Sequence, residues 1–138
     1  VVMDLIGYAS SEPGSQDPVF GVQVPDVGDY LFVIGNGNSQ DETQQTVSLA
    51  HTTGLGKTVG ILAPQSGNFF ISSVFMRSDH GLLWYKGVPA VFFTDGANFR
   101  NPNYHKPSDL PETLDRDFLV ANAKIIAATV AIFAEILP

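Results

Sequence analysis

The sequence predicts an α/β domain in which helices flank a layered sheet. Four apolar runs rich in β-branched and aromatic residues stand apart along the chain, at residues 1–6, 30–34, 58–62 and 88–93. They are almost continuously apolar, as expected of strands that are covered on both faces. Helical patterns lie between and after them, and this alternation favours a layered α/β fold. A chain of 138 residues has room for one domain with one hydrophobic core.

The first predicted helix lies between the second and third apolar runs. Ser39 and Glu42 mark its start, because they can form a capping box in which each side chain satisfies the other residue's free amide. The helix is expected to run to about His51 and to stop at Gly54, since glycine readily adopts the left-handed conformation of a helix end. We interpret His51 as a surface residue or a partner of the helix C-terminus.

Two further helices are predicted, a short one over residues 79–87 and a long one from near Asp115 to the C-terminus. Apolar residues recur in the long helix at spacings of three and four, which predicts one buried stripe: Leu119, Ala123, Ile126, Val130, Phe133 and Leu137. Asn122, Lys124 and Glu135 interrupt its apolar character, so we expect a packed helix and no membrane span.

Composition and charge exclude several kinds of partner. The net charge is −7 and the seven basic residues are scattered, so the chain has no basic stripe for phosphates and nucleic-acid binding is not expected. The absence of cysteine excludes disulfides and thiolate metal sites. Residues 1–8 are not expected to be a signal peptide, because Asp4 interrupts an apolar run that no basic segment precedes. Residues 10–28 are rich in Gly, Pro, Ser and Asp and predict a long surface loop.

Two glycine-rich segments match phosphate-binding motifs only in part. The segment Gly-Leu-Gly-Lys-Thr at residues 54–58 has His51 where the full motif needs its first glycine. The segment Gly-Asn-Gly-Asn at residues 35–38 has Gln40 in place of the third glycine of a dinucleotide fingerprint. We interpret both segments as tight turns.

Asp4 and His105 are the clearest candidates for chemistry. Asp4 lies within an apolar run, and a carboxylate buried there would need a cation or several hydrogen-bond donors. The alternative is that Asp4 ends the strand and reaches water. His105 lies in a proline-stiffened stretch, residues 101–115, that can be neither helix nor strand. We therefore expect this stretch to be a rigid loop that presents the imidazole to a partner. A carboxylate and an imidazole together suit zinc.

Asp79 and His80 are adjacent in the sequence, before the short helix. They can be part of a site, or Asp79 can simply cap the helix.

Four segments together resemble a known family. Residues 3–8 (Met-Asp-Leu-Ile-Gly-Tyr), 77–80 (Arg-Ser-Asp-His), 86–96 and 103–115 occur in the order found in the second half of zinc-dependent aminopeptidases of the co-catalytic di-zinc exopeptidase family, which also includes glutaminyl cyclases. The resemblance covers nearly the whole chain. It implies that residues 1–138 form a single partial domain, the C-terminal portion of a zinc exopeptidase (phosphorylase/hydrolase-like) fold without its N-terminal half.

The resemblance also implies roles for individual residues. Asp4 matches a ligand of one zinc ion, and His105 matches a ligand of the other. Tyr104 matches a tyrosine that in some members stabilises the tetrahedral intermediate, as an oxyanion donor would. Three further residues are implied to orient groups around the metals or to brace the loop: Asp79, His80 and Asp109.

The sequence departs from the family pattern in several places. Leu83 occupies the position of an aromatic residue and is followed by Trp84, and Lys106 brings a positive charge next to His105. The family's His-x-Asp motif and its Glu-Glu pair, which supply the other metal ligands and the general base, do not occur in this chain. A catalytic zinc ion normally has about three protein ligands and a water molecule. Zinc binding and catalysis by the chain alone are therefore not expected.

The sequence leaves three functions open. The first is the C-terminal portion of a metallo-aminopeptidase, which hydrolyses N-terminal peptide bonds with zinc. The second is a glutaminyl-cyclase-like acyltransferase with an apolar pocket around Trp84, and the third is a non-catalytic peptidase-like binding domain. In each case an open sheet edge is expected to be covered by self-association or by a complementary N-terminal half. The compartment is undecided, and a secreted or periplasmic location would fit the family.

Overall fold

The computed structural model describes residues 1–19, 22–64 and 73–135. Within these residues the sheet has four strands in the order β1-β4-β2-β3. They are β1 (Val2–Met3), β2 (Leu31–Gly35), β3 (Thr58–Leu62) and β4 (Phe92–Thr94). Strand β1 is parallel to β4 and β2 is parallel to β3, whereas β2 and β4 are antiparallel. The result is a mixed sheet with β1 and β3 at its edges.

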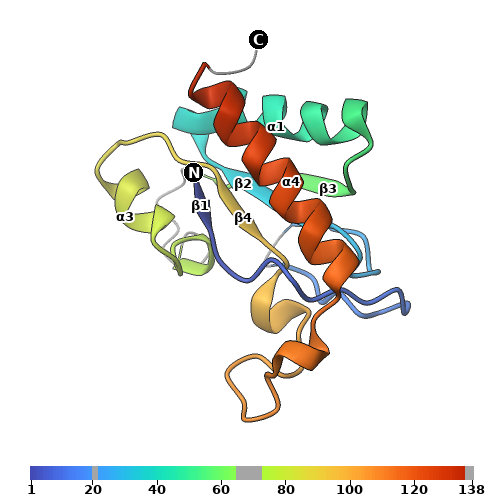
Figure 1. The fold of residues 1–138 in the computed structure, drawn as a ribbon. Coiled ribbons are helices and arrows are strands. Elements are labelled where there is room, and N and C mark those ends of the chain that lie inside the picture. Colours follow the sequence, from blue (N-terminus) through green and yellow to red (C-terminus); the bar gives the residue numbers. More distant parts are fainter. Residues whose placement is uncertain (20–21, 65–72, 136–138) are drawn as a thin grey trace.

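Two long helices cover one face of this sheet (Figure 1). They are α1 (Gln40–Thr53) and α4 (Arg116–Phe133), which contact each other. A hydrophobic cluster lies between them and the strands: Leu31, Val33, Ala50, Val91, Phe93, Ile125 and Ile126.

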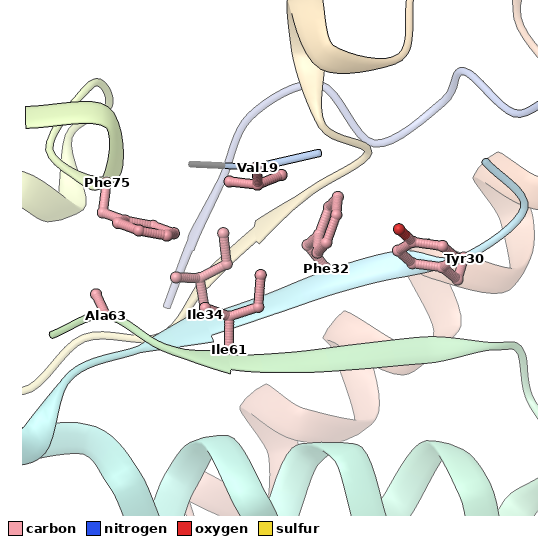
Figure 2. Packing of buried hydrophobic residues seen from close by; sticks show 7 residues of the cluster. All are labelled: Val19, Tyr30, Phe32, Ile34, Ile61, Ala63 and Phe75. Carbon is pink, nitrogen blue, oxygen red and sulfur yellow. The ribbon is translucent and has the colours of Figure 1, made fainter. Parts of the chain in front are cut away.

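The opposite face carries a second hydrophobic cluster. Alternate residues of β2 point to the two faces, so Phe32 and Ile34 lie here together with Tyr30, Ile61 and Ala63. Figure 2 shows these side chains turned away from α1, with Val19 and Phe75 above them. The loop that contains Val19 and the short helix α3 (His80–Tyr85) belong to this side of the molecule.

The predicted strands are confirmed, with shorter bounds for two of them. The predicted run 1–6 contains only β1 as a strand, because Leu5 adopts a left-handed conformation (φ 58°) and turns the chain away. The predicted run 88–93 contains β4 near its end, and Pro89, which has no N–H to donate, lies outside the strand.

The first helix is confirmed, but its predicted capping box is wrong. Helix α1 ends at Gly54, whose φ of 64° is left-handed as expected. The Ser39 side chain makes no capping bond to α1. The Ser39 hydroxyl is used one turn earlier, in a box with Asn36 that surrounds the 3-10 turn Gly37–Ser39.

The glycine-rich segments are turns, as interpreted. Residues 54–58 lead from a helix to a strand, whereas a phosphate-binding loop leads from a strand to a helix. Lys57 forms an ion pair with Asp29. A Cβ atom at Gly35 would collide with the Thr43 hydroxyl of α1, so close packing of strand and helix explains that glycine.

The long helix is confirmed, but it ends at Phe133 and not at the C-terminus as predicted, and its predicted stripe is partly wrong. Asp115 caps α4 by accepting a hydrogen bond from the Phe118 amide. Ala123 and Val130 are exposed, and Leu137 lies outside the described residues. The buried residues of α4 are Asn122, Ile125, Ile126 and Thr129. Two of these are polar and are tolerated inside because each has a hydrogen-bond partner.

In the described part of the chain, no helix combines the length and the apolar character that crossing a bilayer requires.

Candidate functional site

An apolar cleft opens on the face of the sheet opposite α1. Its walls include Val19, Phe32, Ile34, Ile61, Phe75 and Phe92, and its volume is about 80 Å³. Polar side chains line it as well, among them Asp4, Ser78, His80 and Tyr104. An apolar cavity with a few convergent polar groups is typical of a small-molecule or side-chain binding site.

Asp4 lies immediately after β1 and is exposed, so the expectation of a buried carboxylate is wrong. The strand ends at Met3, and Asp4 keeps only a backbone bond to the sheet, from its N–H to the Phe93 carbonyl. The alternative interpretation, a strand end that reaches water, is the correct one. The Asp4 carboxylate accepts a hydrogen bond of 3.1 Å from the Ser78 hydroxyl, which orients it at the cleft.

His105 has a strained backbone. Its φ is 57°, in the left-handed region that residues other than glycine seldom occupy. Such conformations cost free energy and gather at functional sites. The imidazole is exposed and stacks on the Tyr104 ring with 3.9 Å between the ring centroids. Tyr104 lies at the cleft, so the stack places His105 beside it.

The loop that carries His105 is held by its own hydrogen bonds. The Asn101 side chain donates to the Asp109 carboxylate (3.3 Å) and accepts from the Asn103 amide (2.8 Å). The bond between Asn101 and Asp109 joins the two sides of the loop, while the role of Asp109 stays a prediction. The Lys106 ammonium donates to the Pro102 carbonyl and is thereby held within the loop.

His80 is a buried aromatic wall of the cleft. Its ring stacks on Phe92 at 4.0 Å and meets Trp84 edge to face at 4.6 Å. The Phe75 carbonyl can only accept, so the His80 Nε2 donates to it, and Nδ1 has no partner among the described residues. Burial lowers the pKa of His80, an effect that the Phe75 bond and the charges of Asp79 and Asp4 oppose. Burial of His80 therefore favours its neutral form.

Asp79 occupies the N-cap position of α3, but its carboxylate makes no capping hydrogen bond within the described structure. The capping interpretation of Asp79 is therefore wrong, and its role near the cleft stays a prediction.

Sequence reasoning missed two residues of this region. Ser78 was noted only as part of a motif, and nothing in the sequence indicated that it holds Asp4. Asp95 follows β4 and is 3% exposed, and its carboxylate accepts hydrogen bonds from three backbone amides. Burial raises the pKa of Asp95, and the three amides and the charge of Arg100 counteract that rise. The position of Asp95 directly after an apolar run was the available signal.

The donor groups present do not make a complete zinc site. In residues 1–19, 22–64 and 73–135, no three side chains of His, Asp or Glu come together in a group that could hold a metal ion. Asp4 and His105 have suitable chemistry for zinc, but a catalytic zinc ion takes about three protein ligands. The described residues of this chain therefore do not form a catalytic zinc site by themselves.

Comparison with known proteins identifies the family. The sequence model of peptidase family M28 matches residues 24–130. The chain belongs to peptidase family M28. This confirms the resemblance to co-catalytic zinc exopeptidases and the α/β fold class. The M28 chain is also similar to the uncharacterized protein YfbL of Escherichia coli (strain K12), with 29% identity over 118 residues, 83% of this chain and 35% of YfbL. It thus spans about a third of that relative's length. No solved structure gives a significant match.

Proposed function

We propose that this M28 chain forms the substrate-pocket side of a metallo-aminopeptidase, which removes the N-terminal residue of a peptide with the help of zinc. The observation that carries the proposal is the apolar cleft with Asp4, His80 and Tyr104 along its lining. Membership of a peptidase family supports hydrolysis of a peptide bond. The choice of the N-terminal bond rests on the resemblance of residues 3–8 and 103–115 to segments of zinc-dependent aminopeptidases.

In this proposal the cleft receives an apolar N-terminal side chain. Phe32, Ile34 and Phe92 form its walls, and a charged side chain placed among these three apolar residues would lose part of its hydration. Leucine, methionine and phenylalanine are therefore the preferred classes of residue.

Tyr104 is proposed to donate a hydrogen bond from its hydroxyl group to the oxygen that becomes negative when the peptide carbonyl is attacked. Its position supports this role, since it lies at the cleft and is stacked on His105. A preformed donor at that point stabilises the transition state more than the substrate.

Asp4 and His105 are proposed as two of the zinc ligands. The remaining ligands and the general base are proposed to come from outside residues 1–138, because the chain has neither a His-x-Asp motif nor a Glu-Glu pair. The isolated chain is then catalytically incomplete.

The edge of the sheet at β1 is the proposed place for a complementary part of the fold. Among the described residues β1 pairs with β4 alone, and the side chains of Met3 in this strand and of Val1 before it are 59% and 48% exposed. Unpaired strand edges with apolar side chains promote association. The alternative occupant is a second copy of the chain, and a monomer in light scattering at high concentration would argue against self-association.

The glutaminyl-cyclase alternative has no separate support in the geometry. The Trp84 indole donates to the Ala90 carbonyl and packs on His80, and within the described structure it does not line the cleft.

Titration of the isotope-labelled chain with four amino-acid amides, followed by NMR, tests the proposal. The four ligands are leucinamide, phenylalaninamide, aspartate amide and lysine amide. The two apolar ligands are expected to shift backbone and methyl signals of Phe92, Thr94 and Tyr104, and the two charged ligands are not. Val74→Phe, which narrows the cleft, should weaken binding. Leu82→Phe is the matched control, because Leu82 is 74% exposed and lies on α3 outside the cleft lining. Equal signal shifts with all four ligands, or no signal shift with any of them, would contradict the proposal.

A further inference from the structure

Asp95 connects the two segments that carry Asp4 and His105. On one side, its backbone N–H donates to the Leu5 carbonyl (2.6 Å), and its Oδ2 atom accepts from the amides of Gly7 (3.1 Å) and Tyr8 (2.8 Å). These residues form the turn that follows Asp4. The backbone of Leu5 is in the left-handed conformation, which ends the strand. The turn is therefore not held by the hydrogen bonds of a regular helix or strand.

On the other side, the Oδ1 atom of Asp95 accepts from the Ala97 amide (3.0 Å). Ala97 begins the 3-10 turn Ala97–Phe99, and its carbonyl accepts from the Asn101 amide (2.7 Å). The Asn101 carbonyl in turn accepts from the Tyr104 amide (3.2 Å). An unbroken series of hydrogen bonds therefore runs from the Asp95 carboxylate to the residue that stacks on His105.

The cost of burying Asp95 shows that its bonds matter. Asp95 is buried, with 3% of its surface exposed, and no cation among the described residues forms a direct ion pair with its carboxylate. Arg100 lies close enough to act on Asp95 electrostatically, but its guanidinium donates to Gln16 and to the Tyr30 carbonyl instead. A buried carboxylate without an ion pair is held by its hydrogen bonds, and here all three donors are backbone amides of the two segments.

From this geometry we infer that Asp95 is a positioning residue that fixes the Asp4 segment and the His105 loop relative to each other. The functional importance of this role rests on the proposed function, in which Asp4 and His105 are metal ligands. One buried carboxylate would then anchor both ligand-carrying segments. Asp95 does not itself line the cleft, so it acts through the backbone of its neighbours.

Amide hydrogen exchange followed by NMR tests the inference. In Asp95→Asn at least one amide of Gly7, Tyr8 and Ala97 faces the new NH₂ group, which cannot accept a hydrogen bond. Exchange of these amides and of the Tyr104 amide should accelerate by about tenfold or more, because bonds to a charged acceptor are lost. The amides of β2 and β3 should keep their relative protection. Asp29→Asn is the matched control, since it removes a carboxylate whose partner is Lys57.

A role in overall stability alone would accelerate exchange everywhere, and that uniform result would overturn the inference. Acceleration confined to Gly7 and Tyr8, with Tyr104 unchanged, would overturn it as well. Asn101→Ala should accelerate exchange of the Tyr104 amide while the amides of Gly7 and Tyr8 stay protected. This result would show that the His105 loop depends on Asp95 and that the Asp4 segment does not depend on the His105 loop.

A measurement on the unaltered chain covers the case in which Asp95→Asn does not fold. At low urea concentrations, the backbone amides of Gly7, Tyr8, Ala97 and Tyr104 should exchange through one shared local opening. The free energy of this opening should then depend on the urea concentration in the same way for all four amides. Separate openings for the two segments would overturn the inference. Neither measurement needs a ligand, so a failure of leucinamide to bind would count against the proposed function and leave the coupling standing.

Discussion

Asn122 gives a sharp test of how the Asp4 segment is fixed to the rest of the fold. It is 1% exposed on the buried face of α4, and its side-chain amide donates a 2.9 Å hydrogen bond to the Ile6 carbonyl. Ile6 lies two residues after Asp4, where the chain has left β1. The Asn122→Ala substitution removes the donor and leaves a small cavity.

The magnitude follows from these two losses. An unsatisfied buried carbonyl costs about 1–3 kcal/mol, and the cavity left by the amide group adds to that cost. We expect the free energy of unfolding to fall by about 2–3 kcal/mol, which corresponds to a shift of the urea midpoint of about 1 M or more at the m-values of small proteins.

The assay is urea unfolding followed by Trp84 fluorescence, with Asn38→Ala as the matched control. Asn38 is exposed, so its truncation should change the free energy of unfolding by no more than about 0.5 kcal/mol. If the two variants have the same urea midpoint, Asn122 does not hold Ile6 and the reasoning is refuted.

Three further predictions concern buried or strained side chains. Because burial lowers the pKa of His80 below its usual 6.5, the unfolded chain binds a proton that the folded chain does not, and the free energy of unfolding should fall as the pH drops below 6.5. Urea midpoints between pH 7.5 and 5 measure this fall, and His80→Phe should make it shallower; an unchanged slope in that variant would contradict the assignment. His105→Gly should be more stable than His105→Ala by about 1 kcal/mol, because only glycine occupies φ 57° without strain and both variants lose the stack on Tyr104. Equal thermal midpoints would show that the loop relaxes. Arg100→Ala should destabilise the chain by about 3 kcal/mol or more in urea unfolding, because it removes two buried charge-assisted bonds, whereas Arg116→Ala at the exposed start of α4 should have little effect. A small loss for Arg100→Ala would show that its bonds to Gln16 and to the Tyr30 carbonyl contribute little to stability.

Local signals predicted most of the elements. The end of α1 at Gly54 and the start of α4 at Asp115 both depend on residues next to each other in the chain, and both predictions are confirmed. The capping box failed because Ser39 had two possible partners, and the Asn36 turn uses it first. Strand order and direction could not be predicted, since the pairing of β4 between β1 and the antiparallel β2 joins segments far apart in sequence.

Buried polar residues are where periodicity gave the wrong answer. Asn122 and Thr129 lie on the buried face of α4 because their hydrogen bonds are satisfied, which apolar spacing does not register. The sequence could not decide between a buried and an exposed Asp4, because its neighbours are apolar and only the turn at Leu5 brings it to the surface. Ser78 and Asp95 act through contacts with distant segments, which only the fold reveals.

We propose that this chain carries the substrate pocket and only part of the zinc ligands of an M28 peptidase. Calorimetric titration of zinc into the purified, folded chain, with His105→Ala alongside, tests it most directly. We expect no stoichiometric zinc binding by either protein, because Asp4 and His105 alone are too few ligands. Stoichiometric binding that His105→Ala abolishes would instead place a complete metal site within residues 1–138.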